Sequence, residues 1–405
     1  MKFKVQTQKN KVVIILLVIL LVIFSTLAPI KTFCATSQTT EIAEDLNNTI
    51  IDELEQIDFS ELNLVVQDFQ NKKTNIFSLD NIKNKVFSII SGENALSYEN
   101  LFASLFSNLI ELVLKYLPML SVIIAIGVIG NLLNGVKSKF NDKSTSNLIH
   151  AVCFMSAVIL VIGIISNLST STGDSISSMV GQMNALFPIL LTLMVGIGAN
   201  ASAGAFQPIV AIMSTYIADA FNYFILPLFM FSFVFGIISN LSDNIKLDKF
   251  SGFISSLFKW SVGLIFTLFF AVFTIQGITA GSFDSVSIRT AKYSIRSYVP
   301  IMGGYLSDGM DLILSSTVLI KNSIGLVGIL MIITTMLSPL LDVVVCSLLL
   351  KLVSAILQPM GSSKLSNFLT STSKSITMLS TCLIAVGFMY LISIGLVMTT
   401  SNVVM

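Results

Sequence analysis

Residues 257–279 read LFKWSVGLIFTLFFAVFTIQGIT and contain one charged side chain, that of Lys259. A run of about 20 mainly apolar residues is long enough to cross the hydrocarbon core of a bilayer as a helix. A helix also satisfies its own backbone hydrogen bonds, which lipid cannot do. This stretch therefore predicts a membrane-spanning helix.

Four further runs of the same kind support this interpretation. They are Tyr116–Leu133, Leu148–Ile165, Phe221–Ile238 and Ile376–Met398. The 405-residue chain is 54% hydrophobic and 11% charged, whereas a soluble domain carries about 25% charged residues. The charge is too sparse to cover a soluble surface. The predicted fold class is all-α: a polytopic helical membrane protein with about six to eight spans after an N-terminal signal.

Two regions do not divide cleanly into spans. Met183–Ile197 is a short apolar run followed by small residues at 198–205 and a second run, Phe206–Ala218. We interpret it as a hairpin of two short helices joined at membrane depth, which requires protein or water around the freed backbone groups. Ile324–Met360 is too long for one span and contains Pro339 and Asp342. It predicts either one long tilted helix with a surface helix, or two half-length helices.

The N-terminus has the pattern of an export signal. Basic residues up to Lys11 precede the apolar run Val12–Ala28, and small polar residues follow. Residues 1–35 are therefore predicted to be a signal peptide, either cleaved or kept as an anchor helix, and residue 36 emerges outside the cytoplasm.

An acidic extracytoplasmic leader, residues 36–115, precedes the multi-span domain, residues 116–405. Residues 36–105 hold twelve acidic side chains against four lysines. Apolar residues recur every three or four positions, which predicts amphipathic helices. The leader is either a solvated segment that packs locally or floats, or a docking surface for another protein. Its acidity argues against nucleic acid and anionic lipid as partners.

Lysines predict the orientation of the spans. Lys137, Lys139 and Lys143 place the first loop of the membrane domain in the cytoplasm. The loop 169–182 should then lie outside. The connection 242–256 lies in the cytoplasm if residues 183–218 and the next span together cross the membrane an odd number of times, and 280–320 then faces outside.

The polar segment 276–325, QGITAGSFDSVSIRTAKYSIRSYVPIMGGYLSDGMDLILSSTVLIKNSIG, interrupts the apolar domain. Arg289, Lys292 and Arg296 share one helix face, and a break should follow them. The segment is either an interfacial amphipathic helix that binds lipid head groups, or a re-entrant element packed among the spans. In the second case Arg289 or Lys292 pairs with Asp284, Asp308 or Asp311. The candidate residues are Gln276, Gly277, Gly281, Asp284, Arg289, Lys292, Arg296, Pro300, Gly303, Gly304, Asp308, Asp311, Lys321 and Asn322.

This segment closely resembles the stage III sporulation protein AE family of endospore-forming bacteria. The matching features are QGITAG (276–281), Asp284, SIRTAKY (287–293), VPIMGG (299–304) and LIKNSIGLVG (319–328). The resemblance implies a subunit of a secretion-like channel in the mother-cell membrane around the forespore, needed for late forespore gene expression. It also implies partners among the other proteins of the stage III sporulation A operon and, through them, a forespore protein.

The sequence offers little catalytic chemistry. It has no Walker A motif and no HExxH motif, and His150 is its only histidine. We therefore expect no enzymatic activity, no cofactor and no metal. One alternative function is a stand-alone secondary transporter, for which the two interrupted regions would be the discontinuous helices. A passive scaffold for other subunits is another alternative.

Overall fold

A computed structural model describes residue 50, residue 54 and residues 57–72, 82–90, 98–137, 143–241, 247–298 and 302–400. These residues belong to one compact unit, 48–405. The regular structure within them is entirely helical, which confirms the predicted fold class. The predicted signal peptide lies outside the described residues.

Two short helices form the described part of the leader. They are α3 (Ser60–Lys72) and α4 (Ile82–Ile90). Asp58 precedes α3 and accepts a hydrogen bond from the Ser60 backbone N–H at 2.9 Å. Hydrogen bonds from the Ser60 hydroxyl and backbone lower the pKa of Asp58, so the carboxylate remains charged at the start of the helix. Ile82 and Val86 are fully buried. The two helices pack on α6 and α10 respectively.

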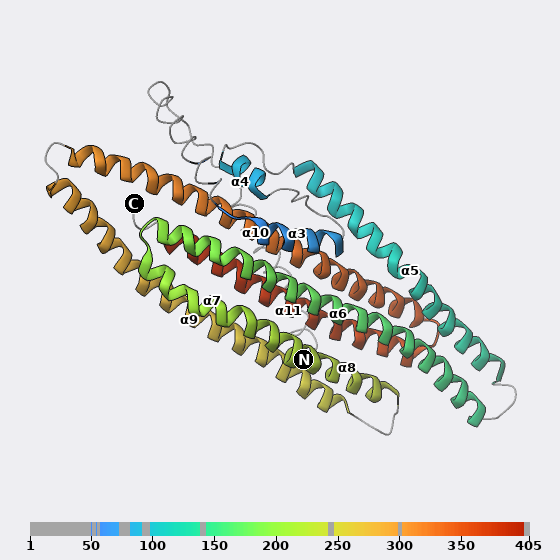
Figure 1. Ribbon diagram of the computed structural model, residues 1–405. Coiled ribbons are helices and arrows are strands. Elements are labelled where there is room, and N and C mark those ends of the chain that lie inside the picture. The colour runs from blue at the N-terminus through green and yellow to red at the C-terminus, as the bar shows by residue number, and fades with distance from the viewer. Residues whose placement is uncertain are drawn as a thin grey trace. The chain divides into compact units, whose positions relative to one another are not determined.

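Long apolar helices make up the rest of the unit (Figure 1). They are α5 (Tyr98–Lys137), α6 (Lys143–Gly196), α7 (Asn200–Asp219), the π-helix η1 (Ala220–Ile225), α8 (Leu226–Leu241), α9 (Asp248–Tyr298), α10 (Gly303–Leu357) and α11 (Ser363–Thr400). Because α7, η1 and α8 follow one another without a break, the described residues contain six candidate membrane spans. This number lies at the lower limit of the predicted range.

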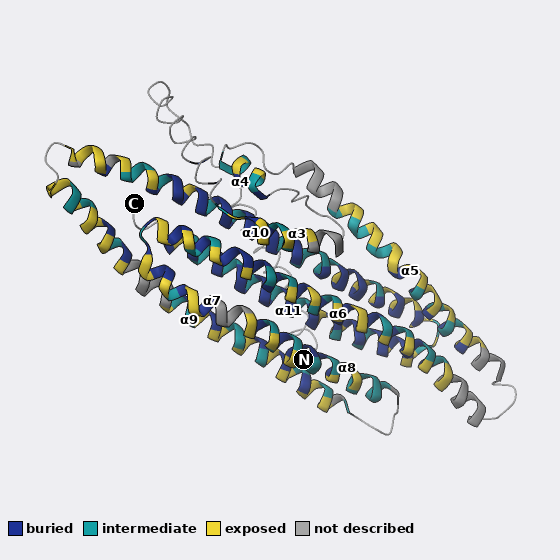
Figure 2. Ribbon diagram, in the orientation of Figure 1, coloured by how far each residue is buried: buried dark blue, intermediate teal, exposed yellow. Residues whose placement is uncertain are grey.

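The α10–α11 hairpin is the centre of the bundle, and α11 is the most buried of the six spans. Hydroxyl groups join its two helices: Ser347 is 2.9 Å from Ser373, and Ser354 is 2.9 Å from Ser366. Small residues of this kind let helix backbones approach closely in membrane proteins. Figure 2 shows buried residues through the middle of α10, whereas α5 is mostly exposed or half-buried.

The outer helices pack around this hairpin. Helix α6 lies against α10 and α11, α5 lies against α10 and α6, and α9 contacts α7, α8, α10 and α11. Tyr116 of α5 donates a hydrogen bond to Asp342 of α10 at 2.6 Å, and Lys115 forms an ion pair with the same carboxylate at 3.1 Å. The charge of Asp342, which lies within an apolar helix, is thus stabilised by two partners on the neighbouring helix α5.

The predicted loop at 169–182 is wrong, because α6 continues through it from Lys143 to Gly196. Some polar side chains of this stretch have hydrogen-bond partners inside the bundle, although Thr172 Oγ1 and Gln182 Oε1 are buried without one. Ser175 donates to the carbonyl of Ser171, and Gln182 donates to the hydroxyl of Thr335 at 2.7 Å. A serine-rich stretch remains helical where its hydroxyl groups bond to the preceding turn.

For 324–360, the predicted single long helix is confirmed, whereas neither the accompanying surface helix nor the alternative of two half-length helices is found in the described residues. Helix α10 passes Pro339 and Asp342 without interruption; Pro339 is buried, and Asp342 has partners on α5. The hairpin predicted at 183–218 is present, but its helices are not short, and its position at membrane depth stays a prediction. The first is the end of α6, and the second continues through α7 into α8.

Successive long helices run antiparallel, so their ends lie at two opposite ends of the bundle. Gly361, between α10 and α11, lies against Asn131 of α5, and Phe154 of α6 packs on Phe368 of α11. Asn240 near the end of α8 also lies beside the start of α11. We call this the lysine end, because it carries Lys137, Lys143, Lys249 and Lys364.

The opposite end, the far end, holds the α6–α7 turn, the α9–α10 turn and the end of α11. The predicted placement of the 134–147 and 242–256 connections at one end, with 280–320 at the other, therefore agrees with the structure. The side of the membrane that each end faces stays a prediction.

Candidate functional site

The polar segment 276–325 forms the α9–α10 hairpin at the far end. Helix α9 ends at Tyr298, and α10 begins with Gly303 and Gly304. The predicted helix break is thus confirmed, with Pro300 outside the described residues. Because α9 continues directly from an apolar span, the basic face belongs to an extension of a transmembrane helix rather than to a separate interfacial helix.

Asp284 of α9 caps the N-terminus of α7. Its two carboxylate oxygens accept hydrogen bonds from the backbone N–H groups of Ala201 and Ser202, each at 2.9 Å. The carboxylate is 2% exposed. The first N–H groups of a helix lack partners within the helix and carry a partial positive charge. A negative side chain from another helix satisfies two of them here.

The turn before α7 is packed onto the same part of α9. Gly198 has φ +81°, a conformation that favours glycine. A Cβ atom at this position would lie 3.2 Å from the Ile288 side chain, one turn beyond Asp284. The α6–α7 turn is therefore held by a cap and by close packing, and the small residues that follow it begin α7.

Lys292 and Arg296 join the two helices of the hairpin. Lys292 forms an ion pair with Asp311 of α10, and the Arg296 Nε donates to the Ser307 hydroxyl at 2.9 Å. The Lys292–Asp311 pair is one of those that the spacing allowed. Arg289 is exposed on the outside of α9. Two residues of the basic face thus contact α10, and the third, Arg289, is exposed.

Lys321 caps the C-terminus of α11. It is fully buried, and its ammonium group donates to the Met398 carbonyl at 2.9 Å. Met398 lies in the last turn of α11, where carbonyl groups lack partners within the helix and cations are favoured. Asp284 and Lys321 therefore secure one helix N-terminus and one helix C-terminus at the far end. Asn322, the next residue, is half-buried.

The remaining candidates are placed only by their backbone. Gln276, Gly277 and Gly281 lie in α9, and Asp308 lies in α10. Their side chains are outside the described part of the chain. Among the described residues, no group of three His, Cys, Asp or Glu side chains is arranged to hold a metal ion.

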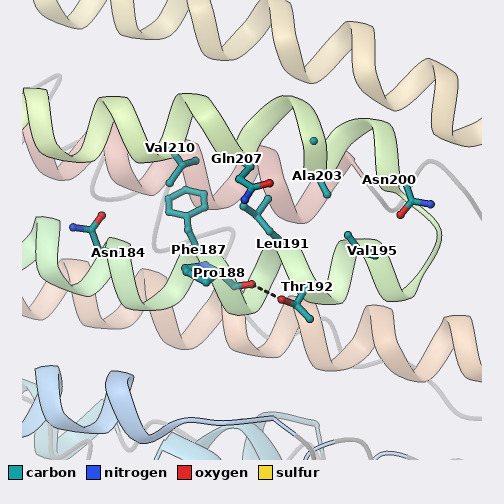
Figure 3. Close-up of a pocket in the computed structure, with 11 residues that line it drawn as sticks. Asn184, Phe187, Pro188, Leu191, Thr192, Val195, Asn200, Ala203, Gln207 and Val210 are labelled. Atoms are coloured by element: carbon teal, nitrogen blue, oxygen red, sulfur yellow. Dashed lines mark hydrogen bonds between the residues drawn. The ribbon is translucent and has the colours of Figure 1, made fainter.

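A groove between α6 and α7, absent from the sequence predictions, lies next to the α6–α7 turn (Figure 3). Its volume is about 540 Å³. Asn184, Asn200 and Gln207 line it and are exposed, and Phe187 and Val210 are buried beneath them. Asn184, Pro188 and Thr192 recur every four residues, so their spacing could have revealed a polar stripe within an apolar run.

The ion pair within the hairpin gives a testable prediction. Changing Lys292→Asp or Asp311→Lys alone puts two like charges side by side, and exchanging both restores the attraction. Because both side chains are partly exposed, we expect each single change to cost about 1 kcal/mol and the exchange to recover most of it. Thermal unfolding in detergent measures this. Single variants as stable as the native protein would show that the pair contributes nothing.

Long apolar helices, buried polar caps and a wholly helical described region define a multi-pass helical membrane protein. A model of the stage III sporulation protein AE family matches residues 81–401, and the chain belongs to that family. It is similar to stage III sporulation protein AE of Bacillus subtilis (strain 168), with 25% identity over 323 residues, covering 80% of this chain and 81% of the relative.

Family membership places the protein in sporulation. No solved structure matches the chain.

Proposed function

We propose that this protein is a membrane subunit of a multiprotein, secretion-like channel that links mother cell and forespore during endospore formation. In this proposal it lies in the mother-cell membrane around the forespore and is needed for late forespore development. Its partners are the other proteins of the stage III sporulation A operon and, through them, a forespore protein. It has no catalytic role.

The observation that carries this proposal is the family match, which extends from α4 to the end of α11. The α6–α7 groove adds a physical argument. Asn184 and Gln207 are exposed carboxamides in a mainly apolar wall, which also holds Thr192 and Asn200. Carboxamide groups form hydrogen bonds between helices in apolar surroundings. A wall of this kind fits contact with further subunits better than contact with lipid.

A stand-alone transporter is less well supported by this fold than by the sequence. That alternative depended on two interrupted segments in corresponding halves of the chain. Helix α10 is continuous through Pro339 and Asp342, so only the α6–α7 turn remains as an interruption. The bundle therefore lacks the pair of discontinuous helices that the alternative required within the described residues.

The groove offers an experiment that separates assembly from folding. We expect the double variant Asn184→Leu, Gln207→Leu to accumulate in the membrane while losing crosslinked partners and late forespore gene expression in sporulating cells. The control is Thr267→Val, an exposed threonine of α9 outside the groove. Partner capture is measured by crosslinking pull-down, and expression by a late forespore reporter.

Two outcomes would contradict the proposal. One is normal partner capture together with normal forespore expression in the double variant. This result would show that the groove does not bind other subunits. The other is solute uptake by the purified protein alone in liposomes, which would favour the stand-alone transporter over the channel subunit.

A further inference from the structure

A second groove runs along the outer face of α9, outside the site described above. It is lined by Lys259, Trp260, Gly263, Leu264, Thr267 and Leu268, and its volume is about 450 Å³. All six residues are exposed, so the groove opens away from the bundle. It lies within the candidate membrane span Lys249–Ile275. We call it the α9 groove.

Most of the α9 groove is apolar. Gly263 has no neighbouring atom of the described structure within 4 Å of a built Cβ, so the helix backbone is open to the outside here. The Thr267 hydroxyl donates to the Gly263 carbonyl at 2.8 Å, and its hydrogen bond is therefore made within the helix. Leu264 and Leu268 are 39% and 58% exposed. This part of the groove is suited to contact with a hydrocarbon chain.

A cation and an indole ring lie together at one end of the α9 groove. Lys259 is the only charged residue between Lys249 and Asp284, and it takes part in no ion pair within the described part of the chain. Trp260 is 69% exposed. Tryptophan is enriched at the membrane–water interface, and a lysine reaches lipid head groups on its flexible stem. This end of the groove is suited to contact with a head group.

Another exposed aromatic ring lies at the same level on the neighbouring helix. Ser232 of α8 and Ser251 of α9 each donate a hydrogen bond to the other's backbone carbonyl, at 3.3 and 2.9 Å. Tyr223 and Trp260 each lie nine residues from this pair, both toward the far end. Tyr223 is 80% exposed. Exposed tyrosine and tryptophan at one level are typical of the head-group region, which supports the same orientation of the groove.

We propose that the α9 groove binds one anionic phospholipid. The ammonium group of Lys259 pairs with the acidic head group, and the indole of Trp260 packs beside the glycerol backbone. One acyl chain lies over Gly263, beside Leu264 and Leu268. A zwitterionic lipid offers the same chain without a net charge, so the contact with Lys259 selects the anionic head group. The attraction of one lysine to an anionic lipid corresponds to a roughly five-fold preference.

A second copy of this chain fits the α9 groove less well. Small residues favour the pairing of membrane helices. However, two copies that pair at Gly263 in the same orientation bring their Lys259 side chains together, one turn away, without a countercharge in the groove. An anionic lipid neutralises this charge instead.

The single tryptophan of the chain makes the proposal directly testable. Because Trp260 has no other tryptophan beside it in the sequence, the emission of the unmodified protein reports on the groove. The full-length protein is reconstituted into phosphatidylcholine vesicles that contain a minor fraction of phosphatidylglycerol with brominated acyl chains, or the same fraction of brominated phosphatidylcholine. We expect brominated phosphatidylglycerol to occupy the groove roughly five times as readily, and therefore to quench Trp260 more strongly.

Three variants assign the preference to the α9 groove. Lys259→Gln removes the charge, and we expect both brominated lipids to quench its Trp260 equally. Gly263→Leu fills the groove without touching another helix, and we expect it to lose most of the preference. Lys249→Gln is the matched control, because it removes an exposed lysine of the same helix that lies outside the groove. It should keep the full preference.

Several outcomes would overturn the proposal. One is equal quenching of the unmodified protein by the two lipids. Another is a preference that survives in Lys259→Gln, or that Lys249→Gln reduces as much as Lys259→Gln does, since the preference would then come from the general surface charge. Quenching by neither lipid would show that a second copy covers the groove. None of these outcomes depends on the proposed channel, because the vesicles contain this protein alone.

Discussion

Replacing Asp284 with alanine is expected to destabilise the protein by roughly 2 to 4 kcal/mol, because two hydrogen bonds to a charged acceptor are lost together. The carboxylate is 2% exposed and accepts from both Ala201 and Ser202. Water reaches the freed N–H groups poorly, so they remain largely unsatisfied. The expected result is a clearly lower unfolding temperature in detergent, together with loss of sporulation in cells.

Two further variants make this result specific. Asp284→Asn keeps one carbonyl oxygen, so it can accept one of the two hydrogen bonds, and we expect an intermediate loss. Asp174→Ala removes an exposed aspartate of α6, and a surface change of this kind costs within about 0.5 kcal/mol. If Asp284→Ala unfolded at the same temperature as Asp174→Ala, the cap would not be what holds the α6–α7 turn on α9.

The second large effect is expected at Gly328, where α6 and α10 touch. A Cβ atom built on Gly328 would overlap the Leu186 side chain, which is itself buried. Overpacking a tight contact costs about 1 to 3 kcal/mol. We expect Gly328→Leu to be at the upper end of that range, because four carbon atoms must enter the space between the helices. Thermal unfolding of the purified protein measures the loss.

The control and the rescue for Gly328 come from the same chain. Gly263 of α9 has no neighbouring atom of the described structure within 4 Å of a built Cβ. Gly263→Leu should therefore be neutral or slightly stabilising, since leucine favours helix over glycine. Combining Gly328→Leu with Leu186→Ala should recover part of the loss. A double variant no more stable than Gly328→Leu alone would argue against direct contact as the cause.

Several local features were predictable because neighbouring residues determine them. The break after Tyr298 follows from Pro300 and two glycines, and the pairing of Lys292 with an aspartate follows from helical spacing. The α6–α7 hairpin was visible in the small residues after Ile197. Two other features were not predictable. Residues 169–182 and 339–342 look like interruptions. Yet Thr335 on another helix accepts a hydrogen bond from Gln182, and Tyr116 on another helix donates one to Asp342.

The sequence by itself determined that this chain is a helical membrane protein with an acidic leader. Its apolar runs are long enough to span a bilayer, and its charged residues are too few to cover a surface in water. Only the tertiary structure decided which runs join into single helices, and that Asp284 and Lys321 cap α7 and α11. Those contacts connect residues far apart in the chain, and their geometry depends on how the helices are aligned against one another.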